Sequence, residues 1–305
     1  MSSGQTTSQI VEQPKLKLTK IIYYKTQYYK EKKNNEDLKK KIEYLQTKIN
    51  KCTNCNNKGE KDEISLLLDL YHFNDMNEFD KLIEIFGEEA SEGISILDMD
   101  TNNEIIYINK LSKAPSGYKA DCKIRIKKTN NIYNISIKSK NGANPSLVNH
   151  TPRNAKIFQR DGVLFDKLNC LDIIIREYIC KREKKEIGED VSSCELTCLK
   201  YDNKLREQFL DVLLYFVFHG SGKGDSKCKA DSIITYQGDK IILNRYDDIQ
   251  KKKVYIESIY DKIVISLRDK GMPKIIDEYC KPWVFNDIKP DGSIKYKGSL
   301  HIRIK

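Results

Sequence analysis

The stretch Ser116-Gly-Tyr-Lys-Ala-Asp-Cys-Lys-Ile-Arg-Ile126, followed after a turn by Asn134-Ile-Ser-Ile-Lys-Ser-Lys140, decides the fold. Apolar and polar residues alternate in both halves, which predicts two short strands joined as a hairpin. Asp121 begins the first strand, and Lys138 lies near the end of the second, 17 residues later. The hairpin therefore brings a carboxylate and a lysine together against an apolar sheet.

Side chains alternate across a strand, so Ser136, Lys138 and Lys140 share one face while Ile135 and Ile137 point to the other. Such a site suits phosphodiester hydrolysis. Asp121 can hold Mg²⁺ through hard oxygen contacts, the carbonyl of Ile137 offers another oxygen, and the metal acidifies a water. Lysine can orient or deprotonate that water, or stabilise the charged phosphate. The alternative is a turn aspartate beside a solvated lysine face.

The hairpin resembles the core of PD-(D/E)xK nucleases, and most closely type II restriction endonucleases with a KAD…SIK form of the motif. The resemblance covers about residues 115–160. It implies that Asp121 is the metal-binding aspartate and that Lys138 is the catalytic lysine. Two residues depart from the pattern: Ala120 replaces the proline, and Ser136 stands where Asp or Glu is usual. The family fold is a central mixed sheet flanked by helices.

Ser136 is a poor metal ligand, although we keep it among the catalytic candidates. The site would therefore lack one anionic oxygen, and a glutamate from an earlier element is expected to supply it. Glu104 is the first candidate ligand. The other candidates are Glu88, Glu89 and Glu92.

The polar segment after the second strand is rich in amide and basic donors and is punctuated by proline. Such a loop can position phosphates or read base edges. The predicted DNA contacts are Lys140, Asn144, Asn149, His150 and Arg153.

The composition limits the class of protein. The chain has 305 residues, with 54 Lys+Arg against 44 Asp+Glu, so its formal charge is +10, which favours polyanionic partners. It contains no apolar run long enough for a membrane span and begins without an apolar leader, so an intracellular, cytoplasmic protein is expected (in a host cell if the source is viral). Nine scattered cysteines do not form a disulfide framework.

The N-terminal part is predicted as a disordered tail over residues 1–15, then a coiled-coil-like helix and linker over 16–60. Apolar residues recur at heptad spacing, with Asn35 at an a position, where one polar residue can set the register of a dimer. The alternative is a lone amphipathic helix. The heptad residues are Leu38, Ile42, Leu45 and Ile49. A homodimer is therefore expected.

Periodicity predicts two helices within 62–90 and strands at 94–97, 105–108, 123–126 and 132–137. Helices follow over 153–183, 204–218 and about 272–280. A terminal hairpin is expected from 294–297 and 300–304. Residues 61–305 thus form a mixed α/β (α+β), restriction-endonuclease-like nuclease domain.

The pair Cys52 and Cys55 has two interpretations. Cys194 and Cys198 could complete a shared zinc site, although their spacing is poor for one. The alternative is a solvated hinge with two incidental thiols.

These features together predict a Mg²⁺-dependent endonuclease that cleaves double-stranded DNA, of the type II site-specific kind. The alternative is a catalytically inactive DNA- or RNA-binding protein that dimerises through its N-terminal helix.

Overall fold

A computed structural model describes residues 12–55, 58–141, 145–150, 163–221, 224–237, 240–270, 272, 276, 278 and 281–305. This part of the chain mixes helices and strands, as the sequence predicted. The helices are α1 (Glu12–Thr53), α2 (Lys58–Asp75), α3 (Phe79–Phe86), α4 (Val163–Glu183), α5 (Thr197–Tyr201), α6 (Asn203–Leu214) and α7 (Ile249–Ile259). No described helix has the length and apolar character needed to cross a membrane.

The first sheet has five strands in the order β1-β2-β3-β8-β9. Its strands are β1 (Ile94–Leu97), β2 (Cys122–Ile126), β3 (Ile132–Ser139), β8 (Ser232–Gln237) and β9 (Lys240–Arg245). The predicted hairpin is present, because β2 pairs antiparallel with β3 and Cys122 lies opposite Ile135. The pairing of β3 with β8 is parallel, and all other pairs are antiparallel. The sheet is therefore mixed.

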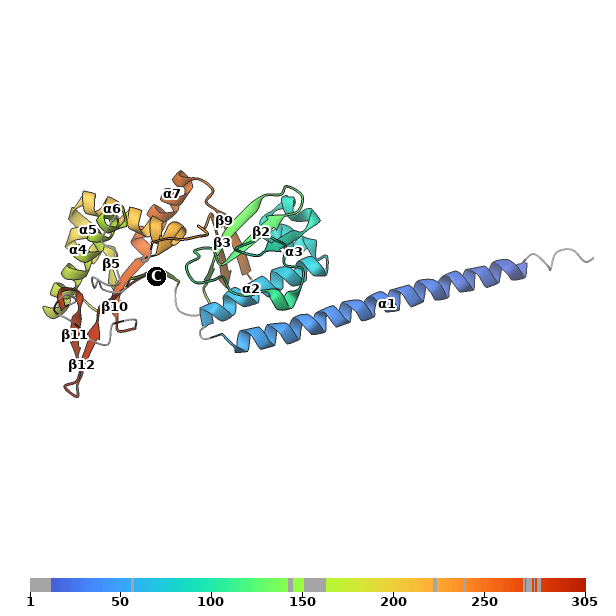
Figure 1. Ribbon diagram of the computed structural model, residues 1–305, viewed down its shortest axis with the longest axis horizontal. Coiled ribbons are helices and arrows are strands. Elements are labelled where there is room, and N and C mark those ends of the chain that lie inside the picture. Colours follow the sequence, from blue (N-terminus) through green and yellow to red (C-terminus); the bar gives the residue numbers. More distant parts are fainter. Residues whose placement is uncertain are drawn as a thin grey trace, which may run out of the picture.

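The apolar face of the first sheet is covered by α2 and α3 (Figure 1). Leu66 and Leu68 of α2 are fully buried against Ile124 and Ile135 of the hairpin. The helix forms because apolar residues face the sheet while charged residues face solvent. This core fixes the position of α2 over the hairpin.

The second sheet has the order β4-β13-β10-β5 and is antiparallel throughout. Its strands are β4 (Ser146–His150), β13 (Ser299–Ile304), β10 (Ile263–Arg268) and β5 (Val191–Ser192). Side chains of this sheet form a second core with α4 and α6. Strand β8 joins the two cores, because Ile234 belongs to the first and the adjacent Ile233 to the second.

Two short ribbons complete the described strands. They are β11 (Phe285–Ile288) with β12 (Ile294–Lys297), and β6 (Gly220–Ser221) with β7 (Gly224–Asp225). The predicted terminal hairpin was therefore wrong: β12 pairs with β11, whereas β13 pairs with β10 and β4. The reason is burial. Residues Ser299–Ile302 are all buried, which suits a central strand, whereas Ile294 is 52% exposed.

The strand predicted at 105–108 is also absent. Only Glu104 forms a bridge, to Leu97, and residues 108–110 form a 3₁₀ turn that buries Ile108. The helix predicted at about 272–280 falls largely outside the described residues.

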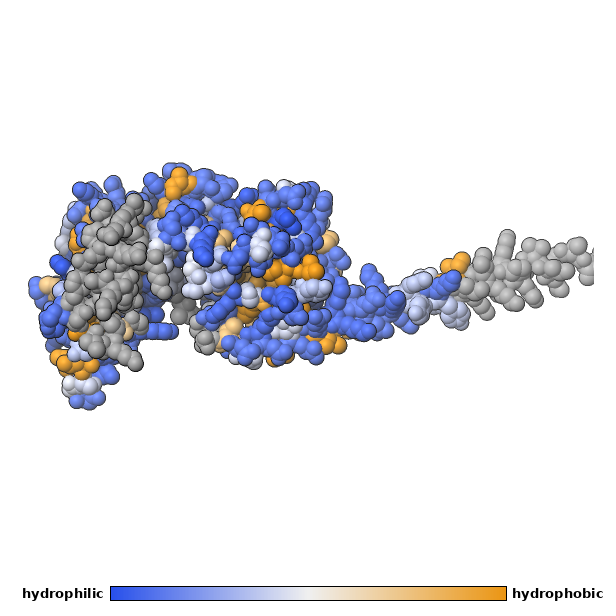
Figure 2. Space-filling model, viewed as in Figure 1, coloured by the Kyte–Doolittle hydropathy of each residue, from blue (hydrophilic) through white to orange (hydrophobic). Residues whose placement is uncertain are grey.

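Helix α1 extends well beyond the folded body as a single rod (Figure 1). Its 42 residues correspond to about 63 Å at 1.5 Å per residue. Only its C-terminal part contacts α2. There, Lys48 Nζ lies 2.5 Å from Asp69 Oδ1, the Tyr44 hydroxyl donates to the same carboxylate, and the Tyr44 ring stacks on His72 with centroids 4.1 Å apart. In Figure 2 most of the visible surface of the body is hydrophilic.

The core supporting the hairpin can be tested with matched isoleucine variants. Ile124 is fully buried, whereas Ile106 is 62% exposed. We expect Ile124→Ala to lower the free energy of unfolding by about 2–5 kcal/mol, because it leaves a cavity. Ile106→Ala should change it by less than about 0.5 kcal/mol. Urea denaturation measures both, and equal losses would contradict this core.

Candidate active site

Asp121 is held by the backbone of the neighbouring strand. Its amide donates to the carbonyl of Ile135 at 2.7 Å. Its carboxylate oxygen Oδ2 accepts from the amide of Ile137 at 2.6 Å and from the hydroxyl of Ser136 at 3.2 Å. Two donors thus fix one oxygen and the direction of the carboxylate at the start of β2.

The two faces of β3 carry the side chains that alternation predicts. Ile135 and Ile137 are buried in the first core, on the side covered by α2. Ser136 and Lys138 lie on the other face, and Lys138 is half-buried. The hairpin therefore brings together Asp121, Ser136, Lys138 and the Ile137 backbone, as the sequence predicted.

Glu63 on α2 supplies a second carboxylate that sequence reasoning missed. Burial and the negative charge of Asp121 together raise the pKa of Glu63 to about 7, although Lys138 opposes the shift. These electrostatic effects place the Glu63 carboxylate beside the hairpin site. Two further charges act on Glu63, those of Glu60 and Lys113, and these two residues pair with each other, with Lys113 Nζ 3.5 Å from Glu60 Oε2.

Lys119 is a second lysine of this site. Burial and the positive charge of Lys138 together lower the pKa of Lys119 to about 8, although Asp121 opposes the shift. The amide of Lys119 donates to the Ser226 hydroxyl at 2.7 Å and to the Cys228 carbonyl at 3.0 Å. The glycine- and lysine-rich loop before β8 thus anchors the start of the strand that presents Asp121.

The glutamates expected to complete the site lie elsewhere. Glu104 faces Arg125, with Oε2 3.7 Å from Nη2. Glu89 accepts from the Tyr133 hydroxyl, and its Oε1 lies 3.6 Å from Arg245 Nη1. The remaining two are exposed on the turn that contains Glu89: Glu88 and Glu92. Glu63, not Glu104, is the glutamate that interacts with Asp121, because α2 rather than the segment after β1 packs over the hairpin.

The predicted DNA contacts are only partly described. Lys140 is exposed at the end of β3, on the first sheet. Asn149 is exposed on β4, in the second sheet. The backbone of His150 also belongs to β4, but its side chain lies outside the described residues, as do Asn144 and Arg153.

The cysteines do not form the shared zinc site that was one interpretation of their spacing. Cys52 and Cys55 pack against the first core, whereas Cys198 packs against the second. Within the described ranges, no group of three or more His, Cys, Asp or Glu side chains is arranged to hold a metal.

A magnesium ion fits the donors that meet at Asp121. Mg²⁺ in proteins is commonly held by one or two carboxylates and keeps several waters. Asp121 and Glu63 offer the carboxylates. The amide and carbonyl of one residue point to the same side of an extended strand, so the carbonyl of Ile137 faces the side on which its amide bonds Asp121. The donor set would be two carboxylates and a carbonyl.

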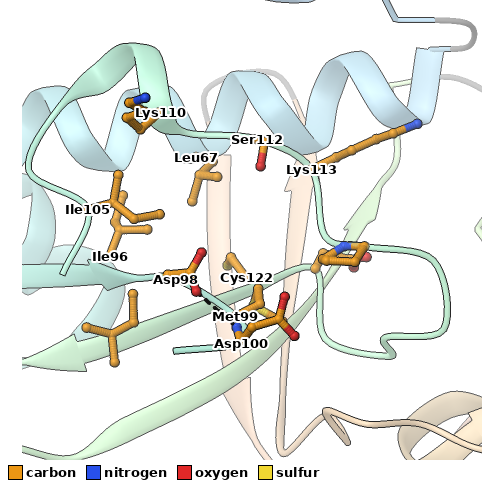
Figure 3. Close-up of a pocket in the computed structure, with 13 residues that line it drawn as sticks. Leu67, Ile96, Asp98, Met99, Asp100, Ile105, Lys110, Ser112, Lys113 and Cys122 are labelled. Carbon is orange, nitrogen blue, oxygen red and sulfur yellow. Dashed lines mark hydrogen bonds between the residues drawn. The ribbon is translucent and has the colours of Figure 1, made fainter. Parts of the chain in front are cut away.

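The pocket beside Asp121 contains further acidic residues that are used locally. Figure 3 shows Asp98 and Asp100 close together, below a loop that crosses in front of α2. Asp98 Oδ1 accepts from the amide and the hydroxyl of Thr101, both at 2.8 Å, and Asp100 accepts from Tyr118. The amide of Thr101 holds the pKa of Asp98 below its usual value. These two carboxylates stabilise a turn.

The pKa of Glu63 predicts a specific pH dependence of stability in EDTA. Glu63 titrates near 4.5 when unfolded and near 7 when folded. Between these values the unfolded chain binds fewer protons, so the free energy of unfolding falls as pH rises, by at most ~1.4 kcal/mol per unit. The loss is complete above about pH 7. Glu63→Gln should remove this part of the slope in urea denaturation between pH 4.5 and 7. The control Glu104→Gln should retain it, and an unchanged slope in Glu63→Gln would contradict the assignment.

Two comparisons with known proteins were negative. No model of a known protein family matches it. No curated protein matches it significantly. The chemistry of Glu63, Lys119, Asp121 and Lys138 is therefore the basis for inferring function.

Proposed function

We propose that this protein is a Mg²⁺-dependent endonuclease that hydrolyses phosphodiester bonds of double-stranded DNA. The observation that carries the proposal is the hairpin carboxylate of Asp121, fixed by the backbone of β3 and joined by Glu63 and Lys138. The mixed first sheet covered by helices also supports it, since the resemblance to PD-(D/E)xK nucleases implies that architecture. A site-specific enzyme of the type II restriction kind is the finer proposal.

Asp121, Glu63 and the Ile137 carbonyl would hold the ion. When bound, Mg²⁺ would lower the pKa of a water and offset negative charge on the phosphate. The pKa of Glu63, near 7 without metal, means that binding a cation would displace its proton near neutral pH. Cation binding should therefore release protons and strengthen as pH rises.

The two lysines have separate tasks in this proposal. Lys138 lies on the strand face beside Asp121, where its ammonium can orient the attacking water and stabilise charge developing on the phosphate oxygens. Lys119 adds a second positive charge, held in place through its backbone by Ser226. Two lysines balance two carboxylates, so the site can accept the negative charge of a phosphate once a cation is present.

Ser136 acts as a positioning residue. Its hydroxyl donates to the Oδ2 of Asp121, which the amide of Ile137 also contacts. A carboxylate at this position would repel Asp121, whereas a hydroxyl donor stabilises its charged form. The serine thus orients the metal-binding aspartate, and Glu63 supplies the second anionic oxygen.

Cleavage of long duplex DNA with Mg²⁺ tests the proposal. The variants Asp121→Asn, Lys138→Met and Glu63→Gln should each lower the cleavage rate by about 10²–10⁴-fold. The two carboxylate variants lose an anionic oxygen that would hold the ion, and Lys138→Met loses the positive charge that would act on the reacting phosphate. The control Glu104→Gln, which removes an exposed carboxylate paired with Arg125, should leave the rate unchanged. Salt-sensitive binding of duplex DNA by wild type, without cutting, would overturn catalysis and support the nucleic-acid-binding alternative.

Removing the Ser136 hydroxyl should lower the cleavage rate by a smaller factor. A hydrogen bond from a hydroxyl to a carboxylate contributes about 1.5 kcal/mol at the lower end of its range, so Ser136→Ala should slow cleavage by about tenfold. Ser95→Ala, a buried serine of β1, is the control and should not slow it. Initial rates at saturating Mg²⁺ measure both. A loss as large as that of Asp121→Asn would show that the serine is essential rather than positioning.

A further inference from the structure

Helix α1 carries an apolar stripe that nothing in the described part of the chain covers. Its four residues recur at spacings of four, three and four: Leu38, Ile42, Leu45 and Ile49. Their exposed fractions are 57%, 53%, 46% and 63%. Large aliphatic side chains exposed in a regular row on one helix are typical of an interaction surface.

The body of the protein occupies a different face of the same helix. Tyr44 and Lys48 contact Asp69, Lys40 Nζ lies 3.1 Å from Asp75 Oδ1, and Lys51 donates to the carbonyl of Asn109 at 2.8 Å. At 100° per residue, this anchored face and the apolar stripe are about 135° apart around the axis. The stripe therefore points away from its own α2 and is available to another molecule.

We propose that the apolar stripe pairs with the same stripe of a second copy of this chain, forming a parallel two-stranded coiled coil. The sequence of the stripe favours this occupant. Ile42 and Ile49 stand at a, and Leu38 and Leu45 at d, the combination that favours two parallel strands. Asn35 is at the preceding a position, where two facing asparagines fix the register and favour a dimer.

The residues that flank the stripe are compatible with parallel pairing. In a parallel dimer each g residue faces the e residue five positions later on the other chain. This places Lys41 against Gln46, and Asn34 against Lys39, so no two like charges meet. An antiparallel pair in which Ile42 faces Leu38 of the other copy would instead set the two copies of Lys41 near each other.

The outer part of α1 gives a second reason for a partner. Tyr24 and Tyr28 continue the d and a positions and are 69% and 62% exposed. This segment projects beyond the body (Figure 1). Isolated helices depend on packing for most of their stability in water. Pairing would cover the two tyrosines, although Glu31 and Asn35 make the middle of the seam polar.

The oligomeric state of the full chain, measured by light scattering without DNA or Mg²⁺, tests the proposal. Wild type should have twice the monomer mass of 35.5 kDa. The double variant Ile42→Ser/Ile49→Ser should raise the dimer dissociation constant by more than about 100-fold, since four apolar side chains leave the seam. The matched control Glu43→Ser/Asn50→Ser changes the neighbouring exposed b positions and should remain dimeric. A monomeric wild type, or a dimer unaffected by the isoleucine changes, would overturn the proposal.

Orientation is tested with two cysteine variants, Asn35→Cys and Leu45→Cys, whose cross-links are mapped by mass spectrometry. In a parallel pair each new cysteine cross-links with its own copy. In an antiparallel pair in which Ile42 faces Leu38 of the other copy, position 35 faces position 45, so neither variant links to itself and a mixture of the two links instead, which would overturn the parallel arrangement. Neither measurement depends on nuclease activity, so failure of this assembly and failure of the proposed function remain distinguishable.

Discussion

The carboxylate of Asp121 is tied to the strand beside it, and the other features of the site depend on that bond. Because the amide of Ile137 donates to Oδ2 at 2.6 Å, the side chain of Asp121 is held against β3 at the start of β2. A buried backbone amide needs an acceptor, so the hairpin and the carboxylate satisfy each other. Lys138 follows Ile137 directly, so its distance from the carboxylate is set by the same strand.

The balance of charges explains why this site tolerates a serine in place of a second hairpin carboxylate. Glu63 approaches from α2, where burial and then the charge of Asp121 raise its pKa to about 7. A third carboxylate would add repulsion that Lys119 and Lys138 could not fully offset. The hydroxyl of Ser136 contributes a hydrogen bond without charge. A hydroxyl at this position is therefore compatible with the charges around it.

The hairpin could be predicted from the sequence, because period-two alternation and the spacing of Asp121 and Lys138 are local features. Helix α1 could also be predicted, because the heptad spacing of its apolar residues is a local feature. Glu63 could not, since only the packing of α2 on the sheet brings it to the hairpin. The signal for it was faint: a glutamate directly before the buried run that starts at Ile64. The position of β13 also required tertiary information, because its partners β4 and β10 are distant in sequence.

The parallel pairing of β3 with β8 has a consequence for how the protein acquires its active form. Ile135 pairs with Ser232, which is 97 residues further along the chain. Contacts of such separation form slowly, because a long loop must close before they stabilise anything. The second sheet also depends on a contact between distant segments, because β4 (Ser146–His150) pairs with β13 (Ser299–Ile304). During synthesis, the hairpin bearing Asp121 and Lys138 therefore emerges long before β8, and the first sheet can close only after β8 and β9 have been made.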